Sequence, residues 1–171
     1  MEWRALVSIA FLLIGGPGFV GGAPIPPASE TEAHLLARLQ AERDPVKKSK
    51  EETRLARMKL RQAIEAYQQG NVEQGAQLLS IYLGRIKDSW QTLENSGRNA
   101  ARNPRGFKEL DIELREDARL LSDLKRRVPY FDRGPIEKAE KEVEQTRAEV
   151  IQALFPAARP QEAAKRSAKT N

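Results

Sequence analysis

The sequence predicts an all-α protein, an antiparallel up-down four-helix bundle with a short extra N-terminal helix. Three observations support this prediction. Apolar residues recur at intervals of three and four along most of the chain, which is the period of a helix with one buried face. No stretch alternates β-branched with polar residues, and no Asn-Gly hairpin signal occurs. Leu and Ala supply most of the apolar surface beside many Glu, Lys, Arg and Gln, a composition typical of helices with solvated outer faces.

Residues 1–23 are predicted to be a cleaved signal peptide. Arg4 precedes the apolar run ALVSIAFLLI, which has the length of a signal-peptide core and is too short for a membrane span. Small residues follow, and cleavage is expected after Gly22 or Ala23. No cysteine follows the run, so lipid attachment is excluded. We therefore expect an exported protein, periplasmic or secreted, with no stable membrane span after processing; an uncleaved membrane anchor is the alternative.

The mature chain has the size of one domain. It contains no cysteine, which removes disulfides, catalytic thiols and thiolate metal sites and leaves the apolar core as the source of stability. We divide it into a Pro-rich lead-in with a short helix (24–45), a helical bundle domain (46–156) and a basic tail (157–171). The tail has no apolar pattern, so we expect it to be disordered.

The short first helix is expected over residues 29–43. Ser29 and Glu32 have the spacing of a capping box. The apolar face consists of Ala33, Leu35, Leu36 and Leu39. Asp44-Pro45 then interrupts the pattern, and a new helix is expected to start here, because Asp is a good N-cap and Pro a good first helical residue. One long helix kinked at Pro45 is the alternative.

Helices over residues 46–69 and 72–96 form the predicted central hairpin. Gly70 suits the position just past a helix end, because glycine reaches positive φ without a Cβ clash. Asn71 is a good N-cap, and Gln74 stands where a capping box needs it. Two apolar stripes should face each other: Leu60, Ala63, Ile64 and Tyr67 before the turn, and Val72, Ala76, Leu79, Leu83, Ile86, Trp90 and Leu93 after it.

The start of the hairpin is expected to be solvated. Lys47, Lys48 and Lys50 lie in a stretch with almost no apolar residue before Leu55. We expect this end of the helix to fray or to project beyond the bundle.

Two further helices are expected over residues 106–127 and 135–155, after a basic loop at 98–106. The apolar face of the first is Phe107, Leu110, Leu114, Ala118, Leu121 and Leu124, and that of the second is Ile136, Ala139, Val143, Val150, Ile151, Leu154 and Phe155. The outer face of the first mixes bases with the acids Glu109, Asp111, Glu113, Glu116, Asp117 and Asp123. Its acids lead and its bases trail, which complements the helix dipole.

No catalytic, cofactor or metal site is expected. The one histidine, His34, is expected to be exposed on a helix, and no Glu-x-x-His pair occurs such as di-metal carboxylate bundles use. Ser80, Ser89 and Ser122 lie inside predicted helices, where a hydroxyl usually bonds a backbone carbonyl. The mature chain has no glycine-rich phosphate loop. We therefore expect a protein that is not an enzyme.

The basic loop is one candidate contact surface, with Arg98, Arg102 and Arg105 in a chain of formal net charge +5. No aromatic residues are interleaved with the basic clusters, and the export signal points away from nucleic acid as a ligand. A protein partner or an anionic envelope component fits weak, salt-sensitive charge better. Ordinary solubility charge is the simpler interpretation.

The turn VPYFDRGP supplies the second candidate, Tyr130 and Phe131. Aromatics in a turn between helices usually plug the end of a bundle, and we favour that interpretation. The alternative is an exposed anchor for a partner. Self-association into a homodimer is a further option for the protein's apolar faces.

Residues 66–79, AYQQGNVEQGAQLL, resemble the helix turn of a single tetratricopeptide repeat. The helix after the turn is about twice as long as in that repeat, and no second copy appears at the expected period. The resemblance therefore implies the turn chemistry and no peptide-binding solenoid. As a whole, the mature chain resembles uncharacterised exported all-helical bacterial proteins.

Together these observations favour a non-catalytic exported interaction or scaffold module of the bacterial cell envelope. The alternative is a periplasmic chaperone-like or stress-protective protein that shelters clients on an exposed apolar face. A chaperone needs a sizeable exposed apolar patch, whereas an interaction module does not need one.

Overall fold

A computed structural model describes residues 31–156, which form five α-helices and one short 3₁₀ helix. In chain order these are α1 (Glu32–Ala41), α2 (Pro45–Gln68), α3 (Val72–Glu94), α4 (Phe107–Arg127), η1 (Tyr130–Asp132) and α5 (Gly134–Leu154). The described residues contain no strand. The all-α prediction is therefore confirmed. The predicted signal peptide, residues 24–30 of the lead-in and the basic tail lie outside the described residues.

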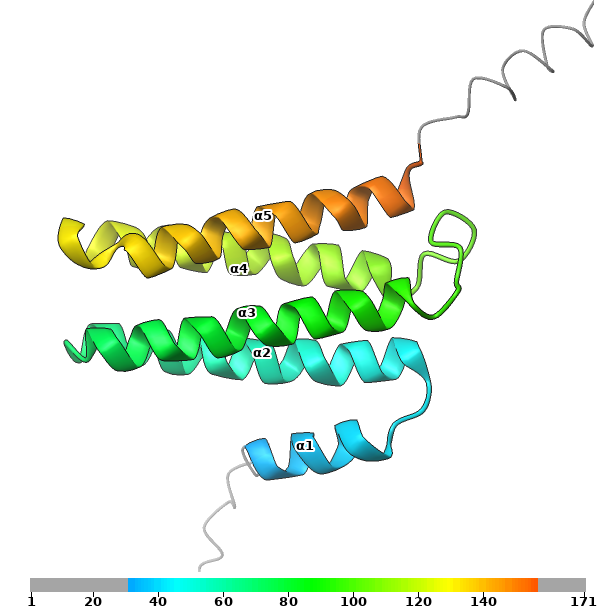
Figure 1. Cartoon of the computed structure of the whole chain (residues 1–171), viewed down its shortest axis with the longest axis horizontal. Coiled ribbons are helices and arrows are strands. Elements are labelled where there is room, and N and C mark those ends of the chain that lie inside the picture. Colours follow the sequence, from blue (N-terminus) through cyan, green and yellow to red (C-terminus); the bar gives the residue numbers. More distant parts are fainter. Residues whose placement is uncertain (1–30, 157–171) are drawn as a thin grey trace, which may run out of the picture.

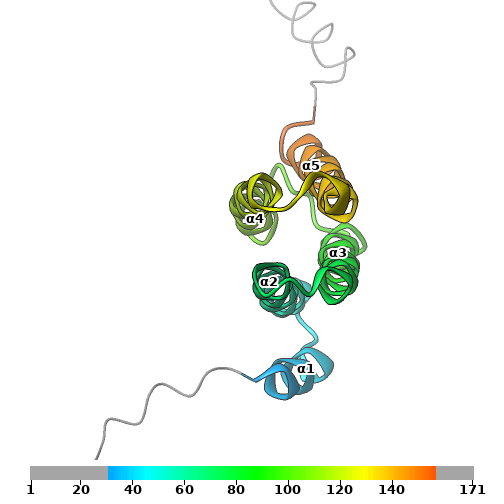
Figure 2. The same ribbon diagram turned by 90° about the vertical axis from the view of Figure 1, so that its left-hand side faces the viewer.

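The four long helices lie side by side, and each runs in the opposite direction to the one before it (Figure 1). α3 packs against α2 and α5, and α4 packs against α5 and α2. Seen end-on, α2 and α3 form one layer and α4 and α5 the next, while α1 lies outside against α2 (Figure 2). The α2–α4 contact is the slightest of the four between the long helices.

The starts of α2 and α1 are each capped by a polar side chain, Asp44 at α2 and Thr31 at α1. The Asp44 carboxylate accepts hydrogen bonds from the backbone N–H groups of Val46 at 2.9 Å and Lys47 at 3.0 Å, and Pro45 is the first helical residue. The expected new helix at Pro45 is therefore confirmed. At α1 the N-cap is Thr31 and Glu32 is already helical, so the expected capping box with Glu32 at its third position is wrong.

The hairpin turn has the backbone that its glycine predicts. Gly70 has φ 81°, in the left-handed region that glycine enters without strain. Asn71 is the N-cap of α3, but its side chain makes no capping hydrogen bond. The expected capping box of Asn71 with Gln74 is therefore wrong, although the residue at which α3 begins is correct.

The main core is built from the predicted faces with three differences. Tyr82, which lies outside the predicted stripe of α3, is fully buried. Asp117, expected on the outer face of α4, is 0% exposed. Phe155, expected in the buried face of α5, is 74% exposed just past the end of that helix. Trp90 is buried as expected, and its ring meets that of Phe107 edge to face.

The first turns of α2 are ordered rather than frayed. Ser49, Glu52 and Thr53 are buried, and Ser49 and Thr53 bond Ser89 of α3. The expectation of a projecting, solvated end is therefore wrong, because polar side chains pack this part of α2 where apolar ones are missing. A separate small cluster joins α1 to α2 through Leu35, Leu39 and Leu55.

Candidate functional site

A groove runs along α2 on the side that faces α1 and α4, and we call it the α2–α4 groove. Its volume is about 860 Å³, within the usual range of ligand sites. Leu35 of α1 lines it on one side, and Glu109, Leu110 and Glu113 of α4 line it on the other. The groove exists because α2 and α4 touch only slightly.

Cations line the groove along its whole length. The five on α2 are Lys47, Lys50, Arg54, Arg57 and Arg61, and the loop before α4 adds Arg105. On α2 they follow one another at intervals of three or four residues, so they share one face of the helix. The sequence therefore places a basic stripe beside the groove.

Four of these cations have no carboxylate within ion-pair distance in the described part of the chain; they are Lys47, Lys50, Arg61 and Arg105. Arg54 pairs with Glu51 at 3.1 Å. The two acids of the groove are already engaged. Glu113 pairs with Arg57, and the Glu109 carboxylate accepts the backbone N–H of Gly106 at 2.6 Å. The six cations of the groove lining therefore outnumber its two carboxylates, although Asp44 attracts Lys47 over a longer distance and Glu116 and Asp117 share Arg57.

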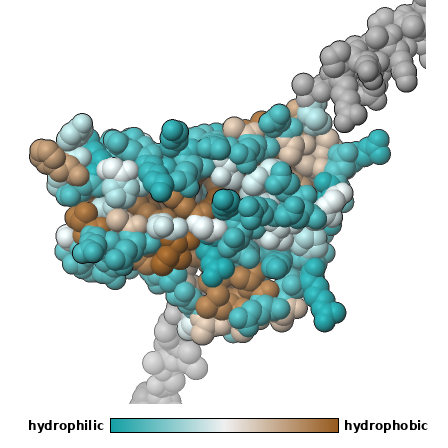
Figure 3. Space-filling view, viewed as in Figure 1, coloured by the Kyte–Doolittle hydropathy of each residue, from teal (hydrophilic) through white to brown (hydrophobic). Residues whose placement is uncertain are grey.

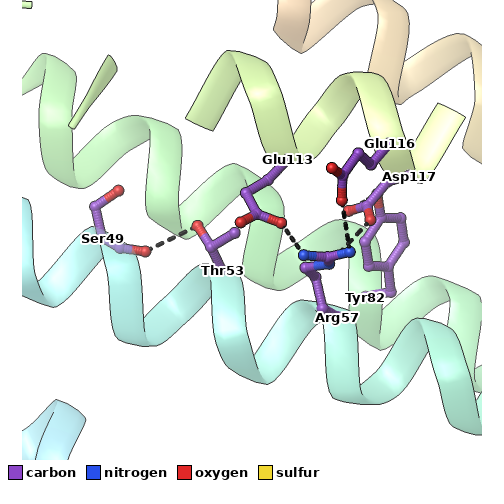
Figure 4. A network of polar contacts seen from close by, with 7 residues as sticks. All are labelled: Ser49, Thr53, Arg57, Tyr82, Glu113, Glu116 and Asp117. Carbon is purple, nitrogen blue, oxygen red and sulfur yellow. Dashed lines mark hydrogen bonds and ion pairs between the residues drawn. The ribbon is translucent and has the colours of Figure 1, made fainter. Parts of the chain in front are cut away.

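Arg57 connects the groove to an ionic network between α2, α3 and α4, whose buried end consists of Asp117 and Tyr82 (Figure 4). Its guanidinium pairs with Glu113, with Glu116 at 3.0 Å and with Asp117 at 3.4 Å. The other carboxylate oxygen of Asp117 accepts the hydroxyl proton of Tyr82 at 3.0 Å. One guanidinium thus holds three carboxylates together, two of them at the surface and one in the core.

Burial dominates the electrostatics of this network. The pKa of Asp117 is raised to about 6: burial is the largest cause, Glu113 and Glu116 add to it, and the Tyr82 hydrogen bond and the Arg57 charge act in the opposite direction. Burial and the Asp117 carboxylate together raise the pKa of Tyr82 well above its ordinary value. Ionised Asp117 is therefore costly in this core, and the Arg57 and Tyr82 contacts offset only part of that cost.

A cluster of three hydroxyls lies under the groove. The Ser89 hydroxyl meets those of Ser49 at 2.8 Å and Thr53 at 2.9 Å, and the Ser49 carbonyl accepts from Thr53. Ser89 bonds across to α2, and not to a carbonyl of its own helix as the sequence suggested. The hydroxyls satisfy one another and contact no base in the described chain. This arrangement joins α2 to α3 through their polar side chains.

Tyr130 and Phe131 lie outside the core. Their side chains are 76% and 94% exposed, and their rings meet edge to face with centroids 5.9 Å apart. The favoured interpretation that they plug the end of the bundle is therefore wrong. Two large aromatic residues in an ordered turn contribute almost nothing to the core, which leaves the partner-anchor interpretation open.

The structure does not bring the five predicted contact residues together. Tyr130 and Phe131 follow α4, whereas Arg98, Arg102 and Arg105 precede it, so the two groups lie at opposite ends of the molecule (Figure 1). Arg102 and Arg105 are exposed, and Arg98 is half-buried with an Nε that has no hydrogen-bond partner. Of these arginines, only Arg105 lines the α2–α4 groove.

The groove itself was missed by reasoning from the sequence. The signal was present, because Lys47, Lys50, Arg54, Arg57 and Arg61 keep a helical period. The sequence does not predict that α2 and α4 make only a slight contact, and this slight contact leaves the basic face of α2 open. His34 is exposed, as expected.

Residues 31–156 offer neither a cluster of metal-ligating side chains nor a helix that could span a membrane. No three His, Asp or Glu side chains in this range are placed to hold a metal ion together. None of the helices in the same range combines the length and the apolarity that crossing a membrane requires.

No family model matches the chain, and neither a curated protein nor a solved structure matches it.

Proposed function

We propose that this chain is a non-catalytic interaction module of the bacterial cell envelope that binds an anionic partner in the α2–α4 groove. The observation that carries the proposal is the set of cations without ion-pair partners along the groove: Lys47, Lys50, Arg61 and Arg105. Like charges held near one another repel, and an anionic partner relieves that repulsion.

The helix pairings support a matching architecture. We propose that α2, α3, α4 and α5 form an antiparallel up-down four-helix bundle, with α1 as an extra helix outside it. Each long helix packs against two of the others, and the turn between α2 and α3 is short enough to force antiparallel neighbours. Such a rigid frame keeps the cations of α2 and the side chains of α4 at fixed distances.

The exported location is part of the same proposal. It rests on residues 1–23, whose charged start, apolar run and small residues have the order of a signal peptide. Expression of the full chain in a bacterial host, followed by mass spectrometry of the purified product, tests it. We expect a mature chain that begins just after Gly22 or Ala23. A product that retains Met1 and stays in the cytoplasm would contradict export.

Binding of poly-L-glutamate tests the interaction itself. We expect calorimetry to show binding at low salt that weakens steeply as salt rises, because the partners are charged and exposed. The double variant Lys50→Glu/Arg61→Glu should bind about tenfold more weakly, since both side chains are exposed and have no partner to lose.

The control for that experiment is Arg119→Glu/Lys141→Glu. It changes the net charge equally at exposed positions away from the groove that form no ion pair within residues 31–156. If both double variants weaken binding alike, general charge and not the groove is responsible. If the wild-type chain does not bind, the proposed function is wrong.

A chaperone-like role is the second candidate, and the exposed Tyr130 and Phe131 favour it. Figure 3 shows hydrophobic side chains in two separate areas of one face, one between α3 and α5 and one beside α1. Suppression of the aggregation of an unfolded client protein tests this role. We expect the wild type to suppress this aggregation and Tyr130→Ser/Phe131→Ser to lose the effect, and equal suppression by the variant would contradict a role for these two aromatics.

A further inference from the structure

We propose that the α2–α4 groove accepts an acidic amphipathic helix contributed by a partner protein. This inference rests on the proposed function and names the class of anionic partner that the groove binds. Three properties of the groove lead to it: the spacing of its cations, the apolar side chains at its base and the elements on its two sides.

The spacing of the cations matches a helical ligand better than an extended one. Along α2 the stripe advances by three or four residues, which is about 4.5–6 Å per step and about 21 Å from Lys47 to Arg61. A helix presents acids on one face with the same steps. In an extended chain, residues on one side are about 6.6 Å apart, so its acids fall out of register with the cations.

The base of the groove requires an apolar stripe beside the acids. Leu35 of α1, Met58 of α2 and Leu110 of α4 line the groove from its three elements. Leu35 and Leu110 are 1% and 2% exposed and close the base, so the apolar surface open to a ligand is that of the half-buried Val46 and Met58 of α2. Met is a side chain that adapts to irregular apolar partners. A ligand with charge alone would leave this surface unused.

The chemistry of the lining argues against other polyanions. None of the described residues that line the groove is aromatic, and single-stranded nucleic acid is normally held by stacking its bases on aromatic side chains. A flat anionic membrane meets a convex or planar surface more readily than a hollow one. A helix laid between α1 and α4 fills the hollow in the way that amphipathic helices fill grooves in other helical proteins.

Two synthetic peptides of identical composition test the inference on the chain from residue 24 to 171. In the first, Glu residues at helical spacing flank a stripe of Leu; in the second, the same residues are scrambled so that neither stripe exists. Fluorescence anisotropy of the labelled peptides measures binding. We expect the first peptide to bind about tenfold more tightly than the second. It should also bind about tenfold more tightly than poly-L-glutamate when affinities are compared per binding site.

Two variants locate the binding. Lys50→Glu/Arg61→Glu should weaken binding of the amphipathic peptide about tenfold, and Arg119→Glu/Lys141→Glu should change it by about twofold or less. Met58→Gln should weaken binding of the amphipathic peptide and leave poly-L-glutamate unaffected, because it removes an apolar contact without a charge. Circular dichroism of each variant checks that the fold is retained.

The possible failures are distinguishable. Equal affinity for the two peptides, with groove-dependent binding of poly-L-glutamate, would overturn this inference and leave the proposed function standing. Absence of binding by every anionic probe would overturn both. Tighter binding to phosphatidylglycerol vesicles than to the amphipathic peptide would replace the peptide with a lipid surface and overturn the inference.

Discussion

At the scale of single residues, Asp117 links the stability of the fold to pH. Its carboxylate is surrounded by Arg57 of α2, Tyr82 of α3 and the acids Glu113 and Glu116 of its own helix. Burial raises its pKa to about 6, whereas an Asp in an unfolded chain has a pKa near 3.9. The folded state therefore binds the proton more tightly than the unfolded state.

We expect Asp117→Asn to remove this pH dependence. Because the folded pKa is raised, the contribution of Asp117 to stability is fully present below about pH 4 and is lost as pH rises through about 6. Between about pH 7.5 and pH 4.5 the wild type should gain about 2 kcal/mol relative to the variant. Urea unfolding across this pH range measures the difference. Parallel stability curves for the two proteins would contradict the burial of an ionisable Asp117.

Two glycines of α3 provide a matched pair at the same scale. A Cβ on Gly75 would lie 2.6 Å from the ring of Tyr67, whereas a Cβ on Gly84 meets nothing within 4 Å. We expect Gly84→Ala to stabilise by about 0.5–1 kcal/mol through helix propensity. Gly75→Ala should destabilise by about 1–3 kcal/mol, because the Tyr67 ring must move. Equal effects in chemical unfolding would show that Tyr67 does not pack on Gly75.

At the scale of elements, α1 is the most separable helix. Its leucines form a cluster with Leu55 that is distinct from the main core, and two ion pairs, Arg38–Glu51 and Glu32–Lys59, add to its contact with α2. We expect residues 44–171 to fold without it, because Asp44 still caps α2. Thermal melting should remain cooperative at a lower Tm. A chain that no longer melts cooperatively would show that α1 belongs to the core unit.

The positions of the helices along the chain were predictable from the sequence, because the helix ends carry strong local signals. The start of α2 is defined by N-cap chemistry at Asp44-Pro45, and the turn before α3 by the positive φ of Gly70, and both signals act over a few residues. The position of the N-cap of α1 was missed by two residues, since both Ser29 and Thr31 are good caps.

Contacts between helices were harder to predict, because the partner of a polar side chain is not encoded locally. Ser89 bonds Ser49 and Thr53 on the neighbouring helix, and no sequence pattern names that pairing. The burial of Asp117 did have a signal. It lies three residues after Leu114 and four before Leu121, on the apolar face, but its charge led us to assign it to the outer face.

At the scale of the whole molecule, the two candidate surfaces lie apart and act independently. The basic groove follows α2 along its length, while Tyr130 and Phe131 occupy the turn between α4 and α5. A partner of ordinary size can cover one surface without the other. Changes at Tyr130 and Phe131 should therefore leave binding in the groove unchanged.

The most direct test of the groove is backbone amide shift mapping by NMR during a titration of the chain with poly-L-glutamate. We expect the perturbed amides to fall within residues 46–61 and 105–113, the segments of α2, the adjoining loop and α4 that line the groove. Perturbations centred instead on the basic loop at 98–102, or on the last turn of α4, where Lys125, Arg126 and Arg127 are all basic, would assign anion binding to those clusters. That result would contradict the α2–α4 groove as the functional site.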